Sequence, residues 1–291
     1  MVQNQIWDLV IINIELMGPN ILDTIKLIKS ANHWTTILIL TNYQQIEHTA
    51  EALQGHEHAD GVLFKPLVKT TFLDLALKLI TNTKNSRQKE QKVILAIGAH
   101  PDDVEIGCGG TLARHQTEGA IINILTLSLG EVGGEKNIRC EESQLAAKVL
   151  QAKLFLGDLT DTRISDGVET IRLIENIVQE IKPTHVYTHS RHDTHQDHRN
   201  VHLAAMVACR SISNLFCYQS PSATIDFRPN LFIDISDYLP QKLAALASYK
   251  SQVNLHLYIT EEMIRAMSLY WGRFANGSHA EPMEIIRQQY R

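Results

Sequence analysis

Apolar and polar residues alternate in blocks along this chain, and the blocks predict strands that are each followed by a helix. In the first part of the chain, apolar runs of strand length occur over about 6–14, 36–40 and 61–64. Residues at helical spacing follow these runs, and they predict helices that contain Ile21 to Ile28, residues 43–53 and Phe72 to Ile80. Such alternation is typical of a parallel sheet.

The same alternation resumes at Lys92 and continues to the end of the chain. We expect strands over about 93–99, 121–128, 153–156, 184–189, 215–218 and 231–235. We expect helices over about 110–118, 139–150, 168–181, 198–211, 237–250 and 261–275. The predicted fold class is therefore α/β, with a Rossmann-like, mostly parallel sheet in this part of the chain.

A polar segment separates the two blocks. Residues 83–91 read Thr-Lys-Asn-Ser-Arg-Gln-Lys-Glu-Gln and contain no apolar anchor, so we interpret them as a linker. The predicted organisation is a first domain over 1–82, the linker over 83–91 and a second domain over 92–291.

Composition and charge narrow the classes of function. The net charge is −5, and no basic cluster is interleaved with aromatic residues, so we expect no nucleic-acid partner. The longest apolar runs are of strand length, and the first residues lack the layout of a signal peptide, so we expect no membrane segment. The four cysteines form no CxxC pair and are expected to be reduced thiols. Together these features predict a cytoplasmic protein.

Candidate chemistry is concentrated where two of the expected strands end. The apolar run that ends at Ala99 is followed by His100, Pro101, Asp102 and Asp103, and then by a Gly-rich turn. Two adjacent carboxylates repel each other and must be desolvated, so packing alone gives no reason to place them there. Open α/β sheets bind ligands at the carboxyl ends of their strands. A cation at this point would resolve the conflict between the two acids.

A second polar stretch follows the strand expected over 184–189. His195 and His198 are three residues apart, which lets them share one face of a helical turn. With His100 and Asp103 they supply enough ligands for a catalytic zinc ion, which keeps three protein ligands and an open position for water. The alternative is a histidine-rich solvated loop, with His100 capping its strand. The occurrence of both stretches at strand ends of one sheet favours the metal site.

These stretches carry a resemblance to a known family. The sequences AHPDDVEIGCGGTLAR and HQDHRNVH resemble the two signatures of the PIG-L/LmbE family of zinc-dependent N-acetylglucosamine de-N-acetylases, and the likeness extends over 92–291. The resemblance implies that Zn²⁺ is held by His100, Asp103 and His198. It implies that Asp102 is the general base, that His195 stabilises the oxyanion or protonates the leaving amine, and that Asp197 orients His195.

Two further residues receive a role from the same resemblance. Arg139 matches the family's arginine and would neutralise charge on the substrate, although a surface arginine at a helix start is the alternative. Glu105 is one residue beyond the commonest spacing, so we interpret it as substrate-binding or as support for the ligands rather than as a ligand. The segment HAEPMEIIR resembles a later landmark of the family but departs from it at Pro282 and Met283.

The first domain resembles the second half of a response-regulator receiver domain, which is flavodoxin-like. The segments DLVIINIEL, ILILTNY and ADGVLFKPL resemble three of its strands, with Thr41 as the switch threonine and Lys65 as the lysine before a proline. Asn13 stands where the phosphate-accepting aspartate would be, and an amide accepts no phosphoryl group. The first two strands of such a domain are also missing. We therefore expect a partial, degenerate receiver that docks a protein partner or self-associates.

The leading hypothesis is a zinc-dependent amidohydrolase that removes the acetyl group from an N-acetylated amino sugar or glycoconjugate. Zinc suits this chemistry because it lowers the pKa of its water to about 7. One alternative is a non-haem Fe(II) oxygenase, since two histidines and one carboxylate also form a facial triad. The other is a metal-binding regulatory or scaffold protein whose receiver remnant docks a partner.

Overall fold

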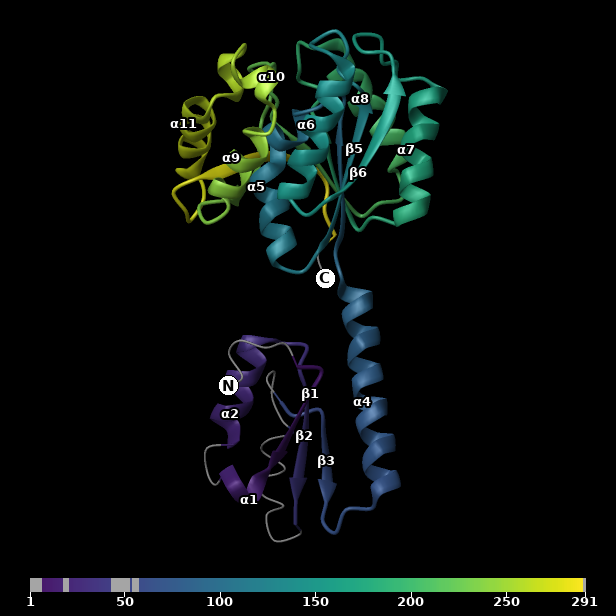
Figure 1. Ribbon diagram of the computed structural model, residues 1–291, viewed down its shortest axis with the longest axis vertical. Helices are drawn as coiled ribbons and strands as arrows, with labels where there is room; N and C mark the ends of the chain where they lie inside the picture. Colours follow the sequence, from purple (N-terminus) through teal and green to yellow (C-terminus); the bar gives the residue numbers. More distant parts are fainter. Residues whose placement is uncertain (1–6, 18–20, 43–52, 54–57, 290–291) are drawn as a thin grey trace. The chain divides into compact units, whose positions relative to one another are not determined.

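The computed structural model describes residues 7–17, 21–42, 53 and 58–289 of the chain. The chain divides into two compact units, Met1–Gln91 and Lys92–Arg291 (Figure 1). None of the described helices is both long enough and apolar enough to cross a membrane.

The first unit contains a three-stranded parallel sheet. Its strands are β1 (Leu9–Asn13), β2 (Thr36–Thr41) and β3 (Gly61–Phe64), in the order β1-β2-β3. The described helices are α1 (Ile14–Met17), α2 (Ile21–Ala31) and α4 (Lys69–Glu90). Apolar residues of α2 and β2, among them Ile25 and Ile37, are fully buried and form the core. The helix expected over 43–53 lies, apart from Leu53, outside the described residues.

Helix α4 continues through the segment that the sequence marks as a linker. It ends at Glu90, whereas the polar segment covers 83–91. Lys, Arg, Gln and Glu have high helix propensity, so a segment without apolar anchors can still prolong a helix. The absence of an apolar pattern therefore indicates where core packing stops, and the backbone stays regular beyond that point.

The second unit is built on a larger sheet. Its strands are β4 (Val93–Gly98), β5 (Ile121–Ser128), β6 (Lys153–Leu159), β7 (His185–His189), β8 (Asn214–Tyr218), β9 (Leu231–Asp234) and β10 (Ala280–Arg287). The seven strands lie in the order β6-β5-β4-β7-β8-β10-β9. All pairs from β6 to β8 are parallel, whereas β10 is antiparallel to both β8 and β9. The prediction of an α/β fold with a mostly parallel sheet is confirmed.

Strand β10 is not predicted by the pattern of the chain. It contains Pro282 and mixes charged with apolar residues, and a proline inside a run argues against a strand. The structure accommodates it because the pairing of β10 with β8 begins only at Met283, so Pro282 pairs with the short edge strand β9 alone. Pairing with distant strands thus determines the secondary structure of a segment whose own sequence pattern does not predict a strand.

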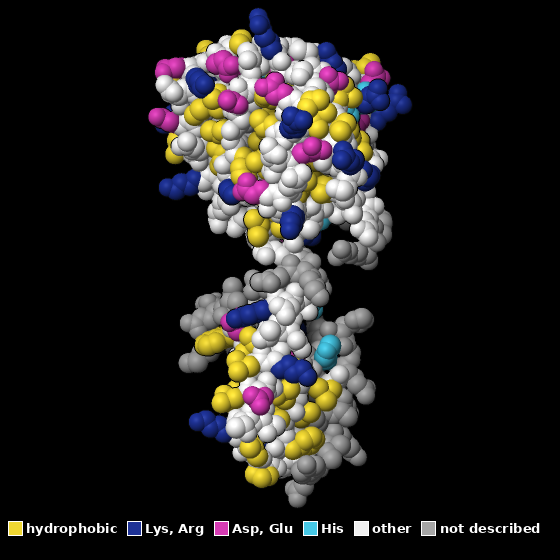
Figure 2. Space-filling model, turned by 90° about the vertical axis from the view of Figure 1, so that its right-hand side faces the viewer, with side chains coloured by type: hydrophobic (Ala, Val, Ile, Leu, Met, Phe, Trp, Pro, Cys, Tyr) yellow, Lys and Arg dark blue, Asp and Glu magenta, His cyan; other side chains and the backbone are white. Residues whose placement is uncertain are grey.

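Helices cover both faces of this sheet (Figure 1). Their bounds are α5 (Asp103–Thr117), α6 (Lys136–Val149), α7 (Val168–Ile181), α8 (Gln196–Ala208), α9 (Leu239–Leu246), α10 (Lys250–Val253), a 3₁₀ turn η4 (Leu257–Ile259) and α11 (Glu261–Gly272). Helices α5, α6 and α9 share one core cluster with one face of the strands, and α7 and α8 share another with the opposite face. On the surface drawn in Figure 2, basic and acidic side chains of this unit are interspersed, and positive charge does not gather into one patch.

Helix α5 corrects an expectation about the Gly-rich stretch. It begins at Asp103 instead of near residue 110, so the glycines lie in a helix and not in a turn. A Cβ on Gly107 would collide with the ring of Tyr218, and a Cβ on Gly110 would lie 2.8 Å from the Ile235 side chain. The glycines therefore permit close packing of α5. The helix is kinked at Cys108, where φ is −144° and ψ is 18°.

Candidate active site

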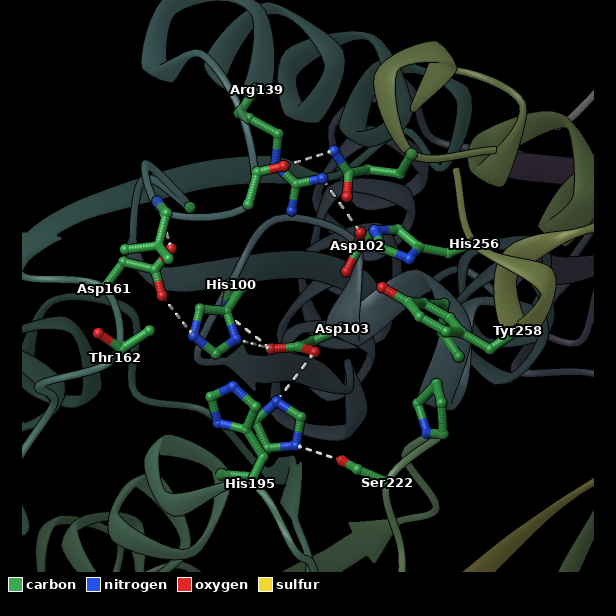
Figure 3. A pocket seen from close by; sticks show the side chains of 17 residues that line it. His100, Asp102, Asp103, Arg139, Asp161, Thr162, His195, Ser222, His256 and Tyr258 are labelled. Carbon is green, nitrogen blue, oxygen red and sulfur yellow. Dashed lines mark hydrogen bonds and ion pairs between the residues drawn. The ribbon is translucent and has the colours of Figure 1, made fainter. Parts of the chain in front are cut away.

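A cavity of about 370 Å³ opens at the carboxyl ends of the parallel strands (Figure 3). Its walls come from the segments after β4, β5, β6, β7 and β8, and from residues between α10 and α11. This is where open α/β sheets bind their ligands, because loops from several strands converge there. The two polar stretches of the sequence, which are far apart in the chain, thus meet in one cavity.

Three of the side chains around this cavity could hold a metal ion. The ligand atoms of His100, Asp103 and His198 lie within 4.8 Å of one another. The Nδ1 atom of His100 is 3.3 Å from one Asp103 oxygen, and Nε2 of His198 is 3.3 Å from the other. Two overlapping groups also meet this distance, His100 with His195 and Asp197, and His189 with Asp193 and His198. Only in the first group do all three residues line the cavity.

The protonation of this cluster fits a cation site. Burial acts to lower the pKa of His198, but the charge of Asp103 and hydrogen bonds to Asp103 and Asp193 outweigh it and raise that pKa to about 9. Burial opposes protonation of His100 as well, yet its carboxylate neighbours raise its pKa well above the usual value. Burial acts to raise the pKa of Asp103, but the charges of His198 and His189 and hydrogen bonds from His100 and His189 hold it well below normal. The raised pKa values favour protonated imidazoles, and a divalent ion would displace these protons because ligand imidazoles must be neutral.

Carboxylates behind the two imidazoles fix the orientation of the rings. The Nδ1 atom of His198 is 2.9 Å from Asp193 Oδ2, which leaves Nε2 facing Asp103. The Nε2 atom of His100 is 3.1 Å from Asp161 Oδ1 and 3.1 Å from Asp197 Oδ2, which leaves Nδ1 facing Asp103. Such carboxylate–histidine pairs are usual behind metal ligands.

The pattern of the sequence does not single out Asp161 and Asp193. Asp193 is held by the hydroxyl groups of Ser220 and Ser222, and Asp161 accepts the backbone N–H of Val132 at 2.9 Å. Asp193 lies within the second polar stretch, so its position in the sequence could have indicated that it belongs to the site. Asp161 follows β6 in a segment without any pattern, and only the strand order of the sheet brings it to the site.

Asp102 lines the cavity beside the candidate ligands (Figure 3). It precedes α5 with a φ of 93°, a left-handed conformation that costs a non-glycine residue roughly 1–2 kcal/mol. Burial raises the pKa of this carboxyl group to about 7; the charge of Asp103 adds to the rise, whereas the charges of Arg139 and His100 oppose it. An ionisation so close to neutrality suits a general base.

Arg139 lines the cavity, but its charge is directed to Asp102. Its Nη1 atom is 3.3 Å from Asp102 Oδ2, and its Nη2 atom donates to the carbonyl of Pro101 at 2.6 Å. A Cβ on Gly130 would lie 3.0 Å from Arg139 Nε, so this glycine leaves room for the guanidinium group. The expected substrate-binding arginine is thus the buried partner of the candidate base.

His195 and Asp197 meet in a way that differs from the expectation. The Nδ1 atom of His195 accepts the backbone N–H of Asp197 at 3.2 Å, and the Asp197 carboxylate instead accepts from Thr162 N at 2.8 Å and contacts His100. Burial, together with the charges of His198 and His100, lowers the pKa of His195. Asp197 therefore orients His195 through its backbone, and its carboxylate orients His100.

Glu105 lies outside the cavity lining. It is on α5 two residues after Asp103, so the two side chains point to different sides of the helix. Burial raises the pKa of Glu105 to about 7, against a hydrogen bond from Tyr249 that lowers it. The structure gives this residue a buried contact with Tyr249, and its expected role in substrate binding or in support of the ligands stays a prediction.

Residues 95–209 match the family model described as PIG-L, GlcNAc-PI de-N-acetylase. The chain is 38% identical over 183 residues to "Uncharacterized deacetylase YaiS" of Escherichia coli K12, and the match covers 60% of this chain and 99% of that protein. The chain belongs to the PIG-L family.

Other relatives of this PIG-L family member are named after different reactions. It is 27% identical over 229 residues to a diacetylchitobiose deacetylase of Thermococcus kodakarensis, with 69% of this chain and 86% of that protein covered. It is 27% identical over 202 residues to a 4-oxalmesaconate hydratase of Pseudomonas putida, with 58% and 78% covered. Among solved structures, the conserved protein TT1542 of Thermus thermophilus matches at a TM-score of 0.62 and 29% identity, covering 68% of this chain and 96% of that chain. Because one fold hosts several reactions, the function must be argued from the site.

Proposed function

We propose that this chain is a zinc-dependent hydrolase that removes the acetyl group from an N-acetylglucosamine-type sugar or glycoconjugate. The observation that carries the proposal is the convergence of His100, Asp103 and His198 in one cavity that Asp102 also lines. A binding site for a cation alone has no need of a second carboxylate, Asp102, with a left-handed backbone and a pKa raised to about 7. The PIG-L family membership and the deacetylase relatives support the same reaction.

His100, Asp103 and His198 would hold the zinc ion. Two imidazoles and one carboxylate are a donor set that catalytic zinc sites use. When bound, such an ion supplies a Lewis acid that polarises a carbonyl and makes water more acidic. Asp193 behind His198, and Asp161 and Asp197 behind His100, keep the two rings in the required orientation.

Asp102 is the proposed general base. Its carboxylate takes a proton from the attacking water and can return that proton to the leaving amine. A pKa near the working pH makes both transfers feasible for one group. Arg139 holds the carboxylate in place and limits the rise of its pKa through its charge.

His195 is the proposed donor to the acetyl oxygen as negative charge develops there. Because its Nδ1 accepts the backbone N–H of Asp197, the neutral ring carries its proton on Nε2 and can donate from it. The lowered pKa of His195 favours this role of a neutral donor over that of a charged acid. Asp102 then supplies the proton that the amine needs.

The test is an acetate-release screen over N-acetylglucosamine derivatives. Purified protein is assayed as isolated, after removal of metal by a chelator, and after addition of Zn²⁺, Fe²⁺ or Mn²⁺. We expect acetate release that the chelator abolishes and Zn²⁺ restores. Acetate release that persists without metal, or that depends on Fe²⁺ and O₂, would overturn the proposal.

A hydratase is a second candidate, because the P. putida relative matches at the same identity as the T. kodakarensis deacetylase. A metal and a base that activate water can also add it to a polarised double bond. The substrate named for that relative, oxalmesaconate, carries several carboxylates, so a site for it needs positive charge. The cavity is lined by Asp102, Asp103 and Asp161, and its arginine, Arg139, is already paired. Asp103 and Asp161 are paired as well, with His198 and His100. The charged side chains of the lining thus pair with one another, and a lining without an unpaired arginine favours a neutral amide over a substrate with several carboxylates.

For the first unit we propose a degenerate receiver-like module that docks a partner protein or a second copy of the chain. Lys65 Nζ lies 3.1 Å from Asn13 Oδ1 and 2.6 Å from Glu15 Oε2, at the carboxyl ends of β3 and β1. Asn13 stands where a receiver carries its phosphate-accepting aspartate, and an amide accepts no phosphoryl group. This supports a docking role for the unit. Treatment with acetyl phosphate should leave the protein unmodified by mass spectrometry, and a phosphorylated Asn13 region would contradict the assignment.

The cytoplasm is the proposed location of the whole protein. All four cysteines are free thiols, and Cys108, Cys209 and Cys217 are buried, which fits a reducing compartment.

A further inference from the structure

A second cavity, of about 570 Å³, adjoins the candidate active site. The two cavities share four lining residues, which are Ile106, Pro221, His256 and Tyr258. In Figure 3, His256 and Tyr258 stand at the side of the first cavity, next to Asp102. The second cavity therefore lies directly beside the first, and these two side chains line both.

The wall of the second cavity is apolar. Helix α11 contributes Met263, Met267 and Trp271, which are four residues apart and so lie on one face of the helix. Leu255 and Leu257 add to this wall, although they are 70% and 78% exposed. Methionine and tryptophan side chains adapt to apolar ligands of varied shape. Exposed apolar side chains that gather around a cavity indicate a binding site.

The charged residues of the cavity neutralise each other. Lys242 and Glu281 line it, are almost fully buried and form an ion pair. Both also bind backbone groups of α5, so neither offers an unpaired charge to a ligand. The indole N–H of Trp271 donates to Gln219 at 2.8 Å, which fixes the ring against the cavity. The cavity thus favours an uncharged, apolar occupant.

We propose that the second cavity is a subsite for an apolar alkyl or aryl substituent of the substrate. In this proposal the apolar substituent and the acetamido sugar are parts of one molecule that passes His256 and Tyr258, which line both cavities. This inference rests on the proposed function and names the class of substrate: N-acetylated amino sugars that carry an apolar group.

Kinetics with two glycosides test the subsite. The methyl and hexyl glycosides of N-acetylglucosamine differ only in methylenes, each worth about fourfold in affinity when fully buried. We expect kcat/KM for the hexyl glycoside to exceed that for the methyl glycoside by about tenfold or more, through KM with kcat unchanged. The substitution Met267→Glu should reduce this ratio to near one. Leu269→Glu, on the same helix but outside the cavity lining, should leave the ratio as it is.

A binding experiment separates the subsite from the deacetylase proposal. Hexyl glucoside, which lacks the amide, should change the fluorescence of the protein at submicellar concentration, and Trp271→Phe should remove most of the change. Turnover of the methyl glycoside without a gain from the hexyl group, and without such binding, would overturn the subsite alone. Binding of hexyl glucoside without deacetylation of any glycoside would contradict the proposed function and support an apolar site. If free 1-hexanol bound as tightly as hexyl glucoside, one substrate spanning both cavities would be excluded.

Discussion

Lys242 and Glu281 form a buried ion pair that joins the two halves of helix α5. The kink at Cys108 frees backbone groups that a straight helix would pair internally. Glu281 accepts the N–H of Gly110 at 2.9 Å and that of Thr111 at 2.7 Å, while Lys242 donates to the carbonyl of Ile106 at 2.7 Å. The pair thus fixes the first half of α5, which carries Asp103 and follows Asp102.

Removal of one partner should therefore destabilise the second unit. Glu281→Gln leaves the Lys242 ammonium buried without a counter-charge, and breaking a buried pair in this way costs about 3–5 kcal/mol of unfolding free energy. Urea unfolding followed by circular dichroism measures the change. Glu262→Gln, at an exposed position of α11, should stay within about 0.5 kcal/mol of the parent protein. The double variant Lys242→Met/Glu281→Gln should recover part of the loss, and an equal loss in both variants would argue against the pair.

Asp102→Asn should abolish turnover and leave metal binding intact. The amide is nearly isosteric but cannot accept the proton of water, and loss of a positioned base lowers kcat by about 10²–10⁴-fold. Asp103→Asn is the matched comparison, because this neighbour is a candidate ligand and its change should release the metal. Metal content by plasma spectrometry and kcat on the same preparations distinguish the two roles. Persistent activity in Asp102→Asn would show that another group is the base.

Arg139→Gln should move the acid limb of the pH–rate profile to higher pH. The charge of Arg139 lowers the pKa of Asp102, so its removal raises that pKa. The base is active as a carboxylate, so activity falls as the pH drops through the pKa of Asp102. The acid limb should therefore move to higher pH by about one pH unit or more. The measurement is kcat/KM between pH 5 and 9. Arg265→Gln, at an exposed position of α11, should leave the profile unchanged, and an unmoved limb in Arg139→Gln would contradict the pairing.

Metal binding should release protons. Without metal, the pKa of His198 is raised to about 9 and that of His100 lies well above normal, so both rings are protonated at pH 7. Binding of Zn²⁺ near pH 7 should then release about two protons. The affinity for Zn²⁺ should rise with pH until the pH reaches the pKa of His198. Calorimetry in two buffers of different protonation enthalpy gives the count. His198→Ala should reduce it, whereas His33→Ala in the first unit should not; a count of zero would contradict the charged cluster.

The sequence predicts the parts of the site that are local to strand ends. His100 and Asp103 follow the end of one apolar run, and His195 and His198 lie within ten residues of the end of another. Because parallel strands bring their carboxyl ends to one edge, the pattern predicts that these residues meet. The direction of each side chain does not follow. Asp197 turns to His100 and Glu105 turns to Tyr249, because helix phase and packing decide those contacts. Asp161 and strand β10 depend on pairing between distant segments, which leaves no local signal.

The second unit should fold and work without the first. The two core clusters of the second unit contain only residues from Ile94 onward, and the cluster of the first unit ends at Val62. A fragment over 92–291 should thus give a cooperative thermal transition and keep kcat/KM for methyl N-acetylglucosaminide within about twofold of the full chain. A fragment over 100–291, which lacks the inner strand β4 between β5 and β7, is the comparison and should not fold. An insoluble 92–291 fragment, or a folded one without activity, would show that the first unit contributes to the enzyme and is more than a docking module.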